Sequence, residues 1–341
     1  MSCVEHQPKP GGLGRILVFL FASATLSLAQ SPASGRDRLP DPVRPEVEAL
    51  YRKGLNYLIG AQTPEGCWQD RYGRFPGVVG LTMMAILAHG EDPNHGPYHK
   101  HLKRALDFLL KKQNTETGYI GDSMYNHGFA TVALAECYGS IDDDRLGPAL
   151  KKATELILTA QSQNPRFGWR YRPESKDADT TVSGAQMVAL FAARNAGIGV
   201  PDDALDRGLA FFSSCQSPGG GFGYSSPGSP NVPRTAIGVL VFALAHQNDA
   251  PGLDQSFRYL TQDLDYRDQN YPFYYEYYMA QALFQVDPAM WKAWDERNVI
   301  YLTENQSEDG SWDGSNGPTF ATAAALLSTA LNYRFLPIYE R

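Results

Sequence analysis

The densest group of side chains that could do chemistry is an aromatic stretch at residues 271–278. It reads Tyr-Pro-Phe-Tyr-Tyr-Glu-Tyr-Tyr. Aromatic faces stabilise cations, including carbocations, whereas phenol hydroxyls equally suit a sugar or another polar ligand. Glu276 is the only acid in the stretch, and on a buried helix it would need a partner or a raised pKa. Tyr274, Tyr275, Tyr278 and Glu276 are therefore candidate cavity residues, with packing between helices as the alternative.

A second candidate group is the run Asp177-Ala-Asp179-Thr180-Thr181, which precedes an apolar segment. Two carboxylates with a neighbouring threonine could arrange a proton between them if the site is apolar. The alternative is structural, because Asp179 or Thr180 would also be a suitable N-cap for the helix that follows.

Tyr125, His127 and Arg234 precede or begin two further apolar segments. An imidazolium beside a helix N-terminus would suit an anion, but a neutral His127 bonded to a loop carbonyl is an equal alternative. Arg234 is a candidate anion ligand or partner for Glu276, and otherwise a rim ion pair of little energetic weight.

The elements that must position these residues belong to a repeat. Each unit has a glutamine that closes an amphipathic segment, here called the anchor glutamine. In all units but that of Gln262 it is followed, after a short glycine-containing loop, by an aromatic residue. The anchors recur every 44 to 55 residues, the length of two helices and two loops, which indicates a repeat architecture. The anchor glutamines are Gln62, Gln113, Gln161, Gln216, Gln262 and Gln306.

Each repeat is predicted to contain two helices of different character. The first is amphipathic, and the second is apolar nearly all the way round, which is typical of a helix buried on every side. We therefore expect an all-α fold, an (α/α)6 toroid of six helix-pair repeats closed into a ring. The predicted outer helices are 45–61, 98–112, 146–160, 202–215, 253–261 and 289–305, and the inner helices are 77–89, 126–138, 181–195, 235–247, 273–285 and 318–333.

The repeat resembles a known family. Residues 53–68, with Gln62, Gly66 and Trp68, have the spacing of the Gln-Trp repeat of squalene and oxidosqualene cyclases, which is related to that of protein prenyltransferase β subunits. Residues 306–312 are a second good match, and Gln161 to Trp169 and Gln216 to Tyr224 are looser ones. The resemblance covers roughly residues 46–335 and implies the terpenoid cyclase toroid with a central cavity.

The resemblance also implies roles for individual residues. Residues 177–181 are similar to the Asp-x-Asp-Asp-Thr motif of class II terpenoid cyclases, which would make Asp179 the proton donor, Asp177 its partner and Thr181 the terminal threonine. Thr180 departs from that motif. His127 with Gly128 resembles the His-Gly start of a prenyltransferase helix that holds an isoprenoid diphosphate, and Tyr125 would line the same mouth.

The first residues form separate segments. Arg15 precedes an apolar run that ends near Ala29, so residues 1–29 are predicted to be a signal peptide for export, or a membrane tether if uncleaved. Residues 30–45 are a proline-rich linker, and residues 46–341 are expected to form the single toroid domain. The formal net charge of −7 and the lack of a basic cluster argue against a nucleic-acid partner.

No cofactor or metal motif is convincing. Asp202-Asp-Ala-Leu-Asp206 spells a magnesium motif, but it follows Pro201 at the predicted start of an outer helix, where acids favour the helix dipole. The cysteines have neither zinc nor redox spacing, although a bridge such as Cys67 to Cys137 stays open.

The sequence is compatible with three functions. The first is an exported toroid that binds an isoprenoid or other apolar ligand, with protonation-initiated cyclase chemistry at Asp179. The second is a ligand-binding or scaffold domain without catalysis. The third is an (α/α)6 carbohydrate-active enzyme, which predicts an open, polar, aromatic groove with acids across it.

Overall fold

A computed structural model describes residues 42–339, and residues 43–339 cluster as one compact unit. The predicted signal segment and the linker up to residue 41 lie outside the described residues. Twelve α-helices are present in residues 42–339: α1 Pro45–Ala61, α2 Pro76–Ala88, α3 His99–Lys112, α4 Met124–Cys137, α5 Leu146–Ser162, α6 Thr180–Asn195, α7 Asp202–Ser214, α8 Val232–Leu244, α9 Leu253–Thr261, α10 Pro272–Val286, α11 Pro288–Asn305 and α12 Pro318–Thr329.

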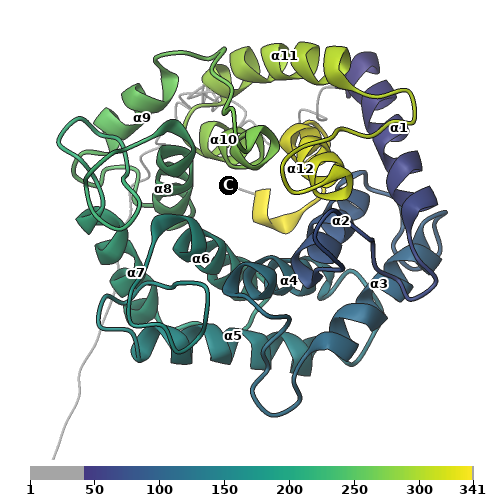
Figure 1. Ribbon diagram of the computed structural model, residues 1–341, viewed down its shortest axis with the longest axis horizontal. Helices are drawn as coiled ribbons and strands as arrows, with labels where there is room; N and C mark the ends of the chain where they lie inside the picture. Colours follow the sequence, from purple (N-terminus) through teal and green to yellow (C-terminus); the bar gives the residue numbers. More distant parts are fainter. Residues whose placement is uncertain (1–41, 340–341) are drawn as a thin grey trace, which may run out of the picture. The chain divides into compact units, whose positions relative to one another are not determined.

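The helices form two concentric rings (Figure 1). The even-numbered helices make the inner ring and contact one another in sequence, and α12 packs against α2 to close it. The odd-numbered helices surround them. This confirms the predicted (α/α)6 toroid of six helix pairs, and each predicted helix is found within a few residues of its expected ends.

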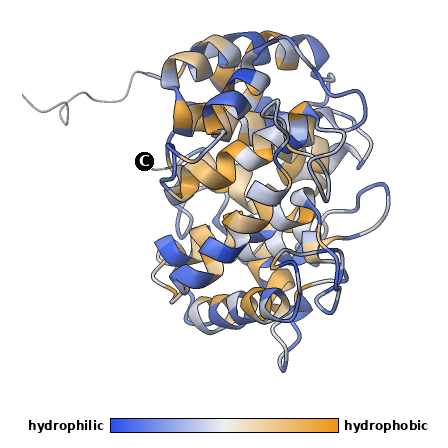
Figure 2. Ribbon diagram, turned by 90° about the vertical axis from the view of Figure 1, so that its left-hand side faces the viewer, coloured by the Kyte–Doolittle hydropathy of each residue, from blue (hydrophilic) through white to orange (hydrophobic). Residues whose placement is uncertain are grey.

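Hydropathy explains which helix lies in which ring. In α3, Leu102, Leu106 and Leu109 form a buried stripe, and the opposite face carries lysines. Every residue of α2 is buried, because outer helices cover one side and inner neighbours the other. Figure 2 shows the same contrast, with apolar residues along the inner helices and polar residues toward the surface.

Small residues let the inner helices approach closely. A Cβ atom on Gly80 of α2 would lie 2.7 Å from the carbonyl oxygen of Phe129 in α4. Only glycine fits there without moving the helices apart.

The anchor glutamines join consecutive repeats. The Gln62 side chain donates from Nε2 to the carbonyl of Gly66 in its own loop (3.2 Å) and to the carbonyl of His101 in the next outer helix (3.0 Å). Gln113 and Gln161 make equivalent pairs of bonds. The predicted bonding of the anchor amide to loop backbone is confirmed for these repeats.

The aromatic partner of the fourth repeat differs from the prediction. The looser match paired Gln216 with Tyr224, but Phe222 is fully buried and stands at the spacing that Trp68 has from Gln62. Tyr224 extends beyond the core to the surface at the inner-ring mouth. Phe222 is therefore the buried aromatic residue of this repeat. Tyr224 lies instead in the wall of the pocket.

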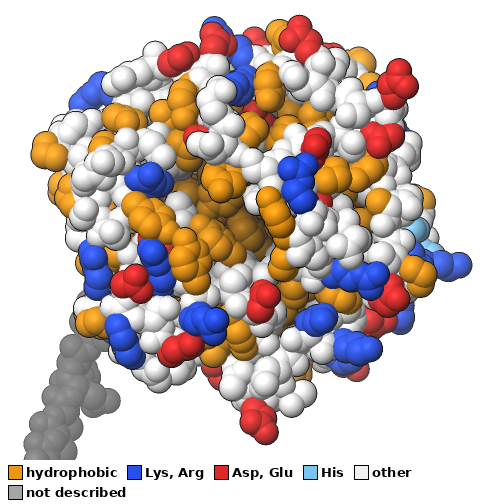
Figure 3. All heavy atoms as spheres, in the orientation of Figure 1, with side chains coloured by type: hydrophobic (Ala, Val, Ile, Leu, Met, Phe, Trp, Pro, Cys, Tyr) orange, Lys and Arg blue, Asp and Glu red, His pale blue; other side chains and the backbone are white. Residues whose placement is uncertain are grey.

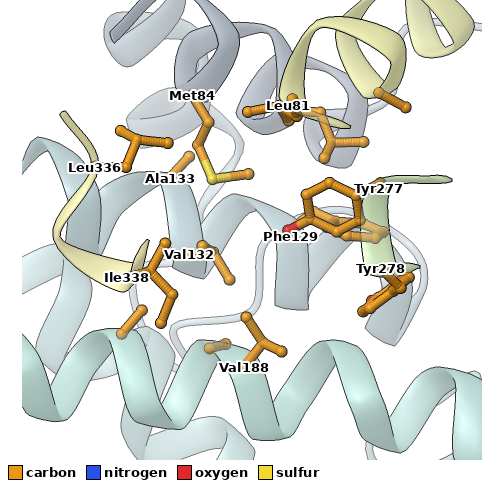
Figure 4. Close-up of a cluster of buried hydrophobic side chains, with 14 of the residues drawn as sticks. Leu81, Met84, Phe129, Val132, Ala133, Val188, Tyr277, Tyr278, Leu336 and Ile338 are labelled. Atoms are coloured by element: carbon orange, nitrogen blue, oxygen red, sulfur yellow. The ribbon is translucent and has the colours of Figure 1, made fainter. Parts of the chain in front are cut away.

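The last predicted helix ends earlier than expected. Helix α12 ends at Thr329. Two short 3-10 turns follow it, η1 Ala330–Asn332 and η2 Pro337–Tyr339. Leu336 and Ile338 are buried within the ring, against a cluster that includes Met84, Ala133 and Val188 (Figure 4). The backbone N–H of Ile338 donates to Oε2 of Glu136 at 3.3 Å. The C-terminal segment therefore fills the centre of the toroid at one end.

Cys67, Cys137 and Cys215 are buried free thiols, so the bridge that the sequence left open is not formed. No helix in residues 42–339 is both long and apolar enough to cross a membrane.

Candidate functional site

A pocket of about 640 Å³ opens where the inner helices begin. The first turns of all six inner helices contribute to its wall, together with the loops that precede them. Figure 3 shows the hollow at the centre of this face. The lining residues are mainly aromatic residues and asparagines: Tyr72, Phe75, Gly77, Val78, Leu81, Ser123, Tyr125, Asn126, Phe129, Tyr171, Thr181, Tyr224, Asn231, Pro233, Arg234, Asp268, Asn270, Tyr271, Tyr274, Asn316 and Phe320.

Three lining tyrosines are exposed. Tyr72 is 69% accessible, Tyr271 53% and Tyr171 46%, and they come from three different loops. Exposed rings around one concave site are unusual, because large aromatic side chains otherwise gain by burial. They give the mouth of the pocket a set of flat apolar faces with hydroxyl tips.

Deeper in the pocket, hydroxyls form a chain. The Tyr125 hydroxyl donates to Oγ1 of Thr181 at 2.5 Å, and that hydroxyl donates to Oδ1 of Asp179 at 2.6 Å. The Tyr274 hydroxyl lies 3.5 Å from the Thr181 carbonyl oxygen. Burial raises the pKa of both Tyr125 and Tyr274, so these phenols are neutral hydrogen-bonding groups.

Asp179 caps α6 and does not line the pocket. Its fully buried side chain accepts from the backbone N–H groups of Thr181 and Val182, both at 2.9 Å, in addition to the Thr181 hydroxyl. Its other oxygen lies 3.3 Å from Nη1 of Arg170. Donor groups therefore contact both carboxyl oxygens of Asp179. The geometry is that of the capping alternative and gives no support to a proton donor.

Asp177 is mostly exposed, with a side-chain accessibility of 68%, and pairs with Nε of Arg170 at 3.4 Å. The Arg170 guanidinium in turn lies 4.8 Å from the Tyr171 ring centroid and 5.0 Å from that of Tyr224. The hydroxyls of these two tyrosines are 2.8 Å apart. The pair of aspartates therefore fixes Arg170, and Arg170 fixes two tyrosines of the pocket wall.

His127 is a structural tie between a loop and two helices. Its ring is fully buried, with Nδ1 3.1 Å from the Ile120 backbone nitrogen and Nε2 3.0 Å from the Ala153 carbonyl oxygen. Nδ1 must accept and Nε2 must donate, which is the neutral tautomer. Burial lowers the pKa of His127 to about 4. His127 does not line the pocket, and its contacts are those of the neutral alternative.

The aromatic stretch is divided between two environments. Tyr274 lines the pocket, whereas Tyr275, Glu276 and Tyr278 do not. Tyr278 packs in the buried cluster of Figure 4 and its ring meets that of Tyr274 edge-on at 5.0 Å.

The pair of Arg234 with Glu276, one of the two roles expected for Arg234, is not formed. Oε1 of Glu276 lies 3.6 Å from Nε of Arg267, and Arg234 is not involved. Neither Glu276 oxygen has a hydrogen bond among the described residues, and burial raises its pKa to about 8.

Arg234 lies in the pocket wall, as predicted for a mouth residue. Nη1 donates to the carbonyl of Ser229 at 2.9 Å, and the guanidinium lies over the Tyr224 ring at 5.5 Å. It is the only lysine, arginine or histidine among the described lining residues.

The candidate site residues predicted from the sequence did not include the exposed lining tyrosines Tyr72, Tyr171 and Tyr271, here called the rim tyrosines, or the four lining asparagines. Tyr171 and Tyr224 each follow a buried aromatic residue by two positions, after Trp169 and Phe222. Period-two alternation after the anchor aromatic was the one available signal.

The fold and the site define an (α/α)6 toroid protein with one aromatic central pocket. The chain belongs to the family described as Domain of unknown function (DUF6288), whose model matches residues 48–231.

Solved structures with the same fold include two kinds of enzyme. An inactive variant of the alpha-1,6-mannanase GH76A of Salegentibacter sp. HEL1_6, in complex with alpha-1,6-mannotriose, matches with a TM-score of 0.66 and 10% identity, covering 85% of this chain and 99% of that chain. The apo type II terpene cyclase MstE from Scytonema matches with a TM-score of 0.60 and 18% identity, covering 85% and 99%. At these identities the likeness establishes the toroid fold alone.

Proposed function

We propose that the central pocket binds a carbohydrate of a few sugar units. A sugar ring has an apolar C–H face and a rim of hydroxyls. Tyrosine offers a matching apolar face and a polar tip, and an asparagine amide both donates and accepts. The observation that carries the proposal is the lining itself, with exposed tyrosines at the mouth and four asparagines among them.

The size of the pocket agrees with a small ligand. A volume of about 640 Å³ lies within the range of about 300–1,000 Å³ that small-molecule pockets have. The mannanase with the same fold is itself described with a bound mannotriose. If residues 1–29 direct export, as their composition predicts, the pocket would meet polysaccharides outside the cytoplasm.

We propose that the pocket binds the carbohydrate and does not hydrolyse it. A glycoside hydrolase needs two carboxyl groups facing one bond. Asp268 is the only acid among the described lining residues, and it accepts from the N–H groups of Asn270 and Tyr271.

The competing proposal is an isoprenoid ligand. Val78, Leu81, Phe129 and Phe320 make part of the lining apolar and favour it. Against cyclisation of such a ligand, the chemistry requires a protonated carboxyl group in an apolar cavity. Asp179 has neither the position nor the partners for that role.

Calorimetric titration separates these proposals. The purified chain is titrated with a panel of trisaccharides and, separately, with a detergent-solubilised C20 isoprenoid alcohol. We expect at least one trisaccharide to bind, and Tyr72→Ala and Tyr271→Ala each to weaken it about tenfold, the effect of about 1.4 kcal/mol.

Tyr138→Ala is the matched control, because Tyr138 is also an exposed tyrosine but stands at the opposite end of α4 from Tyr125. Binding of the isoprenoid with no sugar bound would refute the proposal. Equal losses in the rim variants and the control would refute the assigned site.

A further inference from the structure

We infer that the carbohydrate is acidic, and that Arg234 binds its carboxylate. This inference rests on the proposed function and narrows it to uronic-acid sugars.

The Arg234 guanidinium has hydrogen-bond donors without a partner among the described residues. Only Nη1 is engaged, with the Ser229 carbonyl, and none of the ion pairs found in residues 42–339 includes Arg234. A guanidinium has five N–H donors in a fork that matches a carboxylate. The Tyr224 ring under it holds the plane of the guanidinium.

Two arginines next to pocket residues already have acidic partners. Arg71 pairs with Asp313 at 3.0 Å, and Arg170 pairs with Asp179 at 3.3 Å. Arg234 differs from them because no acid of the described chain is paired with it. An unpaired cation in a concave site is expected to find its counter-ion in the ligand.

The single acid of the lining does not supply that counter-ion. Oδ1 of Asp268 accepts from the N–H groups of Asn270 (3.0 Å) and Tyr271 (2.8 Å), and Oδ2 accepts from the Tyr266 hydroxyl (3.2 Å). Both oxygens of the Asp268 side chain therefore already have donors from its own loop.

The first turns of the inner helices add to the positive potential. Arg234 lies in the first turn of α8, where Asn231 caps the helix with Oδ1 accepting from the Arg234 N–H at 3.0 Å. The cap is neutral, whereas α6 has the carboxylate of Asp179 as its cap. The N-terminus of α8 thus keeps its partial positive charge beside the guanidinium.

Arg234 is the one cationic side chain among the described lining residues, which indicates one negative charge on the ligand. A diphosphate carries several charges and would need several cations to offset its desolvation. A carboxylate needs one bidentate arginine. The charge balance therefore favours a uronate over a phosphorylated ligand.

The test compares uronic-acid trisaccharides with their own methyl esters, which keep the sugar skeleton and remove the charge. Galacturonate, glucuronate and mannuronate trimers are titrated into the full chain and its variants by calorimetry. We expect the wild-type chain to bind one acid about tenfold or more tightly than its ester. Arg234→Gln should remove that preference for the acid over the ester, whereas Arg234→Lys should keep part of it.

Arg258→Gln is the matched control, since Arg258 is exposed on the outer helix α9. Thermal unfolding of each variant shows whether the fold is kept, and Arg234→Lys provides the test if Arg234→Gln does not fold. Equal affinity for acid and ester would overturn the inference and leave carbohydrate binding intact. Binding of neutral trisaccharides with no uronate bound would also overturn the inference alone, whereas binding of no trisaccharide, neutral or acidic, would overturn both.

Discussion

The Gln306 amide donates to the carbonyl of Leu50 at 3.0 Å, across a separation of 256 residues. Its second bond, to the Gly310 carbonyl at 2.9 Å, stays within its own loop. Gln62 makes the same two bonds to its own loop and to the next outer helix. The last repeat therefore binds the first as if it were the next repeat in the chain, and this contact closes the outer ring.

Gln306→Ala should lower the free energy of unfolding by about 1–3 kcal/mol, because two carbonyls lose their donor in a partly buried site. Urea denaturation at pH 7 measures the change. The matched control is Gln262→Ala. Gln262 is an exposed anchor that makes no side-chain hydrogen bond within residues 42–339, and its loss should cost under about 0.5 kcal/mol. Similar losses in both variants would contradict the proposed ring closure.

Asp179→Ala should destabilise the protein more than Asp179→Asn. Both remove the charge beside Arg170, but asparagine keeps an acceptor for the N–H groups of Thr181 and Val182. We expect a difference of about 1 kcal/mol in chemical denaturation. Ligand affinity should fall less in Asp179→Asn than in Tyr72→Ala, since the Asp179 carboxylate acts on the pocket wall only through Arg170. Loss of a catalysed reaction in a fully stable Asp179→Asn would restore the cyclase hypothesis.

His127 should make the protein less stable as the pH falls from about 6.5 to about 4. The unfolded chain binds a proton at an ordinary histidine pKa of about 6.5, whereas burial lowers the pKa of the folded state to about 4. The unfolded state therefore gains up to about 3 kcal/mol over this range. His127→Gln should flatten this part of the stability profile, and His95→Gln, at a highly exposed histidine, should not. An unchanged profile in His127→Gln would exclude a buried neutral imidazole.

Glu276, unlike His127, should make the protein less stable as the pH rises. Burial raises its pKa from 4.5 to about 8, so the folded state holds a proton that the unfolded state releases. Its contribution is fully present below about pH 4.5 and is lost as the pH rises to about 8. Glu276→Gln should therefore be more stable than wild type at pH 8 by roughly 2–4 kcal/mol, with a smaller gain at pH 5. Glu304→Gln, at an exposed position of α11, is the control for urea unfolding at each pH. A larger gain at pH 5 than at pH 8 would reverse the sign and refute the assignment.

Hydrophobic periodicity was sufficient to predict the fold, because inner and outer helices have different hydropathy patterns. Helix α3 has a wet face and α2 has none, and that difference alone assigns them to the outer and inner rings. The C-terminal segment was missed because Leu336 and Ile338 lie in a short irregular run without a period.

The pocket residues were harder to predict, because periodicity does not tell which side chains face the centre. Helix α10 is buried nearly all the way round, so hydropathy cannot tell which of its neighbouring tyrosines faces the centre. Successive residues of a helix point about 100° apart, and only Tyr274 of the predicted stretch of residues 274–278 reaches the pocket. The rim tyrosines come from loops, whose paths no periodicity defines.

The most direct test of carbohydrate binding is a crystal structure of the chain soaked with the trisaccharide that binds best in solution. We predict sugar density in the pocket at the start of the inner helices, with at least one ring against Tyr72, Tyr171 or Tyr271 and a carboxylate at Arg234. A trisaccharide bound on the outer helices, or a pocket filled by an apolar molecule that excludes the sugar, would contradict the proposed function.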